Sequence, residues 1–172
     1  MLDAQAIRNS LGDFTKVIKQ PARFGARLSQ AFSSTEKSIT LEENQILRRP
    51  DVKCGENLFT DGCGSMSPSV ARAIGKALHT KYNRPNHELD NLASCQMRIG
   101  GAKGVMSVDT TLQGHVIVLR PSQEKFHAYS RDVEICSVFT RPLPYFLNRP
   151  LIKILEDLKV EPKVFLEMQK RE

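Results

Sequence analysis

The stretch Gly114–Ser122, GHVIVLRPS, constrains the fold of this chain most strongly. Residues 116–119 form an unbroken apolar run rich in β-branched side chains. Such a run is typical of a β-strand buried on both faces. The segments QMRIGGAKGVMSVD (96–109) and VEICSVF (133–139) predict further strands, the first of them broken in two by glycines. A short strand is also expected at residues 58–60, so the middle of the chain is predicted to be rich in β-structure.

Helices are predicted on both sides of these strands and once among them. Ser67 is a good N-cap and Pro68 suits the first helical position, so we expect an inserted helix over residues 67–82. Pro142 and Pro144 end the β-rich part, and two short helices are expected after Asn148 and from Pro162.

This order of elements predicts an α+β fold, without the strict βαβ alternation of a doubly wound sheet. We expect a helical and loop lead-in over residues 1–56, a β-barrel-like core over 57–140 that contains the inserted helix, and a C-terminal helical pair over 141–172.

The composition allows a polyanionic partner but does not require one. The formal net charge is +6, from 25 Lys and Arg against 19 Asp and Glu. A basic balance of this size suits nucleic acid, and equally a lysine-rich solvated surface. Four widely spaced cysteines (Cys54, Cys63, Cys95 and Cys136) lack zinc-binding spacing and are expected to be buried, reduced thiols.

No targeting or membrane signal is recognised in the sequence. The first 20 residues lack the apolar segment of a signal peptide, and no stretch approaches the ~18 apolar residues of a membrane span. We therefore expect a protein without membrane contact, located inside the cell, in the cytoplasm or the nucleus.

Neither a metal site nor a hydrolase site is predicted. Asp61, in FTDGCGSMSP, follows a predicted strand, as metal-binding carboxylates often do, but the chain has no Asp-x-Asp pair to accompany it. We therefore predict that Asp61, with Gly62 and Gly64, forms a structural turn. No Gly-x-Ser-x-Gly motif supports a nucleophilic serine.

The segment GGAKG (Gly100, Gly101, Ala102, Lys103 and Gly104) has two interpretations. Its glycines let the backbone approach a phosphate closely and Lys103 would supply charge, although the spacing is not that of a Walker loop. Residues 101–104 also fit the GXXG loop of KH domains, but that loop joins two helices, whereas this segment lies between predicted strands. Alternatively, Gly100, Gly101 and Gly104 form a structural turn with an exposed lysine.

Residues 95–131 are locally basic, with five Lys or Arg against two acidic residues, and Phe126 and Tyr129 are interleaved. Basic strand ends beside aromatic residues suit a nucleic-acid backbone, and a charged barrel rim is equally compatible.

Six segments in order resemble the eukaryotic cellular RNA-dependent RNA polymerases of RNA silencing. They are ARFGARLSQAFSST, LFTDGCGSMS, QMRIGGAKGVMSVD, VIVLRPSQEKF, VEICSVF and RPLPYFLNRPLIKILEDLKVEPKVFLEMQ. The resemblance covers roughly residues 20–172 and implies a β-rich core similar to the first of the two double-psi β-barrels of these enzymes.

The resemblance also implies roles for four basic residues. Lys103 and Lys125 would face nucleotide phosphates and RNA, and Arg98 and Arg120 would extend this basic face along the template or product backbone. The implied partners are a single-stranded RNA template, nucleoside triphosphates and the second barrel of the same polymerase.

The family's metal-binding motif is absent from this sequence. The family binds Mg²⁺ through an Asp-x-Asp-Gly-Asp motif on the second barrel, and the 172 residues do not contain it. We therefore expect a polymerase fragment that does not polymerise nucleotides alone. The alternatives are a stand-alone RNA-binding module without catalysis and an inactive structural remnant.

Overall fold

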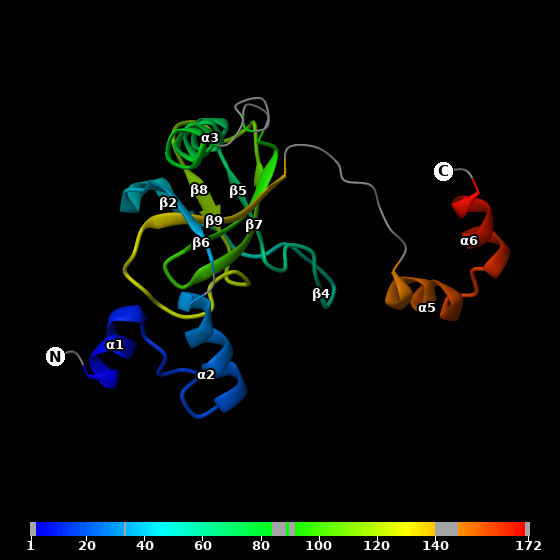
Figure 1. Ribbon diagram of the computed structural model, residues 1–172, viewed down its shortest axis with the longest axis horizontal. Coiled ribbons are helices and arrows are strands. Elements are labelled where there is room, and N and C mark those ends of the chain that lie inside the picture. The colour runs from blue at the N-terminus through cyan, green and yellow to red at the C-terminus, as the bar shows by residue number, and fades with distance from the viewer. Residues whose placement is uncertain (1–2, 33, 84–88, 90–91, 140–147, 171–172) are drawn as a thin grey trace. The chain divides into compact units, whose positions relative to one another are not determined.

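The structure of the protein is a computed structural model, which describes residues 3–32, 34–83, 89, 92–139 and 148–170 (Figure 1). The chain divides into two compact units, Met1–Arg141 and Pro142–Glu172, which are described separately here. The α-helices are α1 (Ala4–Leu11), α2 (Pro21–Leu28), α3 (Pro68–Tyr82), α5 (Arg149–Asp157) and α6 (Pro162–Gln169), and the 3₁₀ helices are η1 (Ser29–Phe32) and η2 (Glu43–Gln45). The strands are β1 (Glu36–Thr40), β2 (Ile46–Arg48), β3 (Lys53–Cys54), β4 (Asn57–Leu58), β5 (Cys63–Met66), β6 (Ser94–Ile99), β7 (Ala102–Val108), β8 (Ile117–Leu119) and β9 (Asp132–Phe139).

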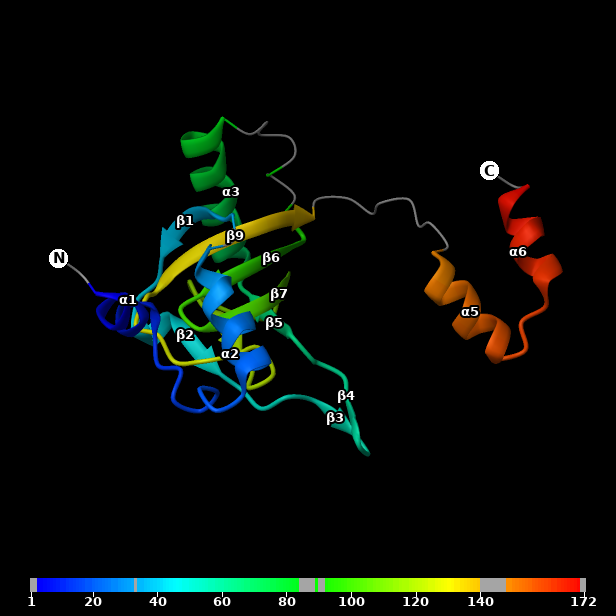
Figure 2. The ribbon, with the colours of Figure 1, turned by 60° about the horizontal axis from the view of Figure 1, so that its bottom comes forward.

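Seven of the described strands form one mixed sheet in the order β1-β9-β6-β7-β5-β8-β2. The β1–β9, β9–β6, β6–β7 and β5–β8 pairs are antiparallel, whereas β5–β7 and β2–β8 are parallel. In Figure 2, β9, β6, β7 and β5 follow one another across this sheet. The α+β class predicted from the sequence is confirmed.

The two edges of this sheet are consecutive in the chain, which requires the sheet to curl. Residues 41–45 join the edge strands β1 and β2. The end of β1 at Thr40 and the start of β2 at Ile46 are therefore no more than about 21 Å apart. The edges of a flat seven-stranded sheet would lie about 29 Å apart. The sheet is therefore curled rather than flat.

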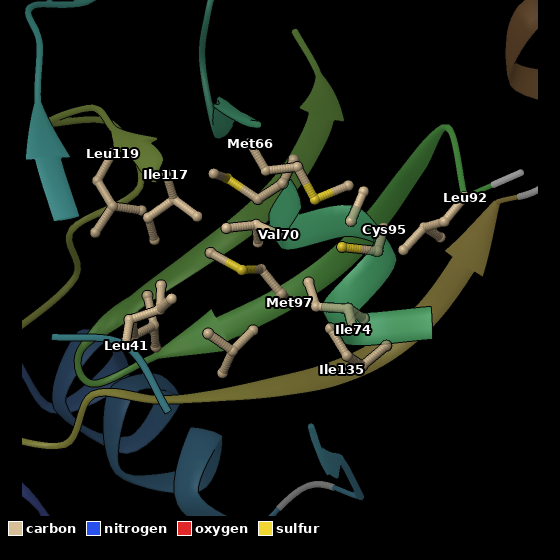
Figure 3. Packing of buried hydrophobic residues seen from close by; sticks show 14 of the residues in the cluster. Leu41, Met66, Val70, Ile74, Leu92, Cys95, Met97, Ile117, Leu119 and Ile135 are labelled. Atoms are coloured by element: carbon tan, nitrogen blue, oxygen red, sulfur yellow. The ribbon is translucent and has the colours of Figure 1, made fainter. Parts of the chain in front are cut away.

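Helix α3 supplies one wall of the hydrophobic core. Its buried side chains include Val70 and Ile74, which Figure 3 shows packed among Met66, Met97 and Ile135 of the sheet. The three residues of β8 are all buried, as the apolar run predicts.

The N-terminus of α3 is fixed as the sequence predicts. Ser67 Oγ accepts a hydrogen bond from Val70 N at 3.3 Å, and Pro68 begins the helix. The same hydroxyl accepts from Val116 N at 3.2 Å, and Ser67 N donates to Val116 O. Ser67 is fully buried, so this cap also joins α3 to the segment that leads into β8.

The stretch predicted as a lead-in contributes two strands to the sheet. Residues 36–40 and 46–48 fall in the predicted helical and loop lead-in over residues 1–56, yet they form the edge strands β1 and β2. A hairpin of β3 and β4 follows, and Figures 1 and 2 show it extending away from the sheet. Two cysteines expected to be buried, Cys54 and Cys63, are exposed, whereas burial raises the pKa of the Cys95 thiol to about 12.

In the C-terminal unit, α5 and α6 begin where the sequence predicts. Asn148 Oδ1 accepts from Leu151 N at 3.0 Å and caps α5, and Pro162 begins α6. Neither helix has a buried residue. No helix in the described part of the chain is long and apolar enough to span a membrane.

Candidate functional site

Three glycines with no room for a side chain lie where β5, β7 and the loop after β8 meet. We call Gly64, Gly101 and Gly104 the glycine junction. A Cβ added to Gly101 would lie 1.7 Å from Phe126 O, and one added to Gly104 would lie 2.1 Å from Gly62 O. A Cβ at Gly64 would lie 2.5 Å from a backbone carbonyl oxygen. Backbones approach here more closely than any other residue type would allow.

The sequence predicts turns at five glycines, and the structure separates them into two groups. They are Gly62, Gly64, Gly100, Gly101 and Gly104. Gly62 and Gly100 have positive φ angles of 70° and 53° and lie in turns, the second at the β6–β7 hairpin with Gly101. Gly64 and Gly104 instead lie inside β5 and β7. Their role is to allow close contact between backbones rather than to reverse the chain.

A buried glutamine fills the space beside these glycines. Gln123 is fully buried, and its Oε1 accepts from Arg120 N at 3.1 Å. Its Nε2 lies 3.4 Å from Met106 Sδ. A Cβ added to Gly104 would lie 2.9 Å from the same Nε2 atom of Gln123. Gln123 therefore fixes the loop of residues 120–125, which we call the lysine loop, against β7.

Backbone hydrogen bonds tie the lysine loop to the start of β7, which brings the backbones of the segments that carry Lys103 and Lys125 side by side. Lys103 N donates to Gln123 O and Lys125 N donates to Gly101 O, each at 3.0 Å. The Lys103 side chain is exposed, and the half-buried Lys125 donates from Nζ to Ser122 O. An ammonium group has three N–H donors, so Lys125 keeps donors for a ligand.

The two predicted arginines are less free than the lysines. Arg98 lies opposite Lys103 in the β6–β7 register, and its Nη1 donates to Gln30 O. Arg120 Nη1 donates to Pro50 O. Because each guanidinium has five N–H donors, both can still bind an anion, but each is also part of the local structure.

A hollow of about 710 Å³ adjoins the lysine loop and is lined in part by Lys125, Phe126 and Tyr129. Its charges are nearly balanced: Lys16, Arg48, Lys125 and Arg131 face Asp13, Glu43 and Glu124. Arg48 Nε lies 3.0 Å from Glu124 Oε1. Lys103 and Arg98 do not line this hollow, so the four predicted basic residues do not share one pocket.

Comparison with known proteins decides the family. The family model for RNA dependent RNA polymerase matches residues 1–172, the whole chain. The chain belongs to the RNA-dependent RNA polymerase family. Among its relatives, RNA-dependent RNA polymerase 1 of Schizosaccharomyces pombe is 37% identical over 97% of this chain, and probable RNA-dependent RNA polymerase SHL2 of Oryza sativa subsp. japonica is 35% identical over 96%.

A solved structure of the same family has a similar fold. The RNA dependent RNA polymerase QDE-1 from Thielavia terrestris superposes with a TM-score of 0.63 and 33% sequence identity, over 78% of this chain and 15% of that one. This polymerase-family chain spans 13% of the length of each of the two relatives named above.

Asp61, which the sequence places in a conspicuous motif, makes no hydrogen bond or ion pair with the described residues. It is exposed in the turn before β5. The carboxylate that fixes this corner is instead that of Asp51, which accepts hydrogen bonds from Ser122 and Thr60. Asp51 lies in a stretch that reads as loop, and its partner Ser122 is 71 residues away, so no local pattern indicates it.

The described residues of this polymerase-family chain do not fit a catalytic metal ion. No group of three His, Cys, Asp or Glu side chains converges anywhere in the described part. A two-metal site for nucleotidyl transfer needs several convergent carboxylates. In the part of the chain that the structure describes, the site therefore consists of basic side chains without a set of metal ligands.

Proposed function

We propose that this chain is a segment of an RNA-directed RNA polymerase that makes complementary RNA by nucleotidyl transfer in RNA silencing. Its curled sheet would correspond to the first double-psi β-barrel of that enzyme. The observation that carries the proposal is a pair of backbone hydrogen bonds in a chain of the polymerase family. Lys103 N donates to Gln123 O and Lys125 N donates to Gly101 O, so the two segments that carry the lysines are paired.

In this proposal the chain supplies positively charged side chains, and carboxylates that are not among the described residues would hold Mg²⁺. Lys103 and Lys125 would neutralise the phosphates of an incoming nucleoside triphosphate or of RNA, where fixed positive charge stabilises the transition state. Arg98 and Arg120 would contact the backbone of a single-stranded template or product through their remaining N–H groups. The second barrel of the same polymerase would be the structural partner, within the cytoplasm or nucleus.

Binding to single-stranded RNA tests the role of the lysines. The variant K103A/K125A is expected to bind at least about tenfold more weakly than the wild-type chain, since each lost phosphate contact lowers affinity. The control R72A/K76A removes the same charge from two exposed positions on α3 and is expected to bind like the wild type. Equal binding by K103A/K125A and the wild type would contradict the assignment of these lysines.

Nucleotide incorporation tests the absence of catalysis. With Mg²⁺, template and nucleoside triphosphates, the purified 172-residue chain is expected to incorporate no nucleotide, because its described residues hold no carboxylate cluster. Incorporation that disappears in K103A/K125A would contradict this expectation.

A stand-alone RNA-binding module is the second candidate, favoured by the same lack of metal ligands. Sequencing the transcript beyond the codon for Glu172 separates the two. An open frame reaching Asp-x-Asp-Gly-Asp supports the polymerase segment, and a stop codon supports the module.

A further inference from the structure

Two polar side chains at the base of the β3–β4 hairpin, Asp51 and Thr60, form a hydrogen-bonded cluster with Ser122 of the lysine loop. Ser122 N donates to Asp51 Oδ2 at 2.9 Å, and Ser122 Oγ donates to Asp51 Oδ1 at 2.7 Å. Thr60 Oγ1 also donates to Asp51 Oδ1, at 2.9 Å. The Asp51 carboxylate thus accepts three hydrogen bonds, two of which come from the lysine loop.

The same cluster closes the base of the β3–β4 hairpin. Thr60 Oγ1 accepts from Val52 N at 2.9 Å, and Ser122 Oγ accepts from Gly62 N at 3.0 Å. Arg120 donates to the carbonyl of Pro50, the residue before Asp51. The lysine loop is therefore hydrogen-bonded to the chain both before β3 and after β4.

Ser122 connects this cluster to the lysines. Its carbonyl oxygen accepts from Lys125 Nζ. The next residue, Gln123, accepts from Lys103 N through its own carbonyl. A displacement of Ser122 would thus move the acceptor of the Lys125 ammonium group, and with it the neighbouring carbonyl that accepts from the backbone N–H of Lys103.

The hydrogen bonds of the cluster also change the titration of Asp51. Those from Ser122, and then from Thr60, hold the pKa of the Asp51 carboxyl below its usual value. The charged carboxylate is the form that the cluster favours, since a carboxylate accepts but does not donate.

We propose that Asp51 is a positioning residue which, through Ser122, holds Lys103 and Lys125 in the arrangement that binds RNA or nucleotide phosphates. Asp51 itself touches no ligand. The proposal rests on the proposed function, because it assumes that the two lysines bind phosphate. It adds a residue from the start of the hairpin to the machinery of the lysine loop.

Affinity for a single-stranded RNA oligonucleotide tests this with four variants. We expect D51A to bind about three- to tenfold more weakly than the wild type, as the loss of one charge-assisted support implies. S122A is expected to weaken binding in the same direction, and S122T, which keeps the hydroxyl, to bind like the wild type. D61A is the matched control: it removes a nearby exposed carboxylate without partners among the described residues and should bind no more weakly than the wild type.

A double-mutant cycle separates positioning from a general loss of stability. If Asp51 acts through Lys103 and Lys125, D51A/K125A loses less affinity than the sum of the losses in D51A and K125A. Additive losses would overturn the proposal. Should D51A fail to fold, S122A/K125A against S122A and K125A gives the same comparison.

Amide hydrogen exchange provides a readout that does not depend on RNA. In D51A or S122A we expect the amides of Lys103 and Lys125 to exchange at least about tenfold faster, with those of β6 and β9 unchanged. Unchanged exchange at both lysines would overturn the proposal. If K103A/K125A binds RNA like the wild type while these amides do respond, the proposed function fails and the positioning of the loop stands.

Discussion

At the residue scale, the glycine junction shows what the sequence indicates and what it leaves hidden. The cluster of glycines in LFTDGCG and GGAKG is visible in the sequence, and turns are the ordinary interpretation. Gly64 and Gly104 lie inside strands. These positions require glycine because backbone carbonyls and Gln123 occupy the space that a side chain would need. That cause could not be predicted, since the atoms involved come from segments far apart in the chain.

Alanine substitutions test this reading. G101A and G104A are expected to lower the free energy of unfolding by at least about 3 kcal/mol, because a Cβ would meet backbone rather than a flexible side chain. G25A is the control: Gly25 lies in α2 with open space around it, so alanine is expected to raise stability by up to about 1 kcal/mol. Chemical denaturation measures all three. A stability of G104A equal to the wild type would show that the strands do not approach so closely.

The Asp132 carboxylate predicts how stability depends on pH. It accepts from Lys37 Nζ and Thr40 Oγ1, each at 2.6 Å, and the hydrogen bond from Lys37 lowers its pKa most. The folded pKa lies below the unfolded value of 3.8, so the stabilisation is present above that value and is lost as the pH falls through the folded pKa.

Urea unfolding between about pH 6 and about pH 3 measures this effect. The midpoint of the wild-type chain is expected to fall on acidification, and that of D132N to fall less. D61N, which replaces a carboxylate without described partners, is expected to follow the wild-type curve. Identical curves for D132N and the wild type would remove Asp132 from the account.

At the element scale, the sequence predicts well those elements that carry their own signals. Helix α3 has a serine cap and a proline, and β8 has an apolar run, so both lie where expected. Strands β1 and β2 carry no such signal. β1 is a polar edge strand in which only Ser38 is buried, and it pairs with β9 some 95 residues away. Local patterns cannot reveal pairing of this range.

The cap of α3 gives a prediction for one element. S67A leaves the N–H groups of the buried Val70 and the half-buried Val116 without their acceptor, so we expect a loss of about 2 kcal/mol in the free energy of unfolding. The control S29A removes an exposed hydroxyl and is expected to change stability by no more than about 0.5 kcal/mol. Equal losses in the two variants would contradict the structural role of Ser67.

At the scale of the whole molecule, the two units differ in how much they bury. The first has a continuous core, whereas α5 and α6 have none of their residues buried. Helices of eight or nine residues are marginal in water without packing. The apolar side chains of both helices are visible in the sequence, but not what covers them.

Hydrogen exchange of the 172-residue chain tests this difference. The amides of α5 and α6 are expected to exchange orders of magnitude faster than those of β6 and β9, which lie inside the sheet. Comparable protection in both units would show that the helical pair is packed in solution.

The salt dependence of RNA binding tests the central claim, that Lys103 and Lys125 contact phosphates, most directly. For single-stranded RNA, each neutralised phosphate contributes about 0.7 to the slope of log K against log salt concentration. The slope of K103A/K125A is expected to be smaller than that of the wild type by about 1.4, and that of R72A/K76A to be unchanged. Equal slopes for the wild type and K103A/K125A would contradict the claim.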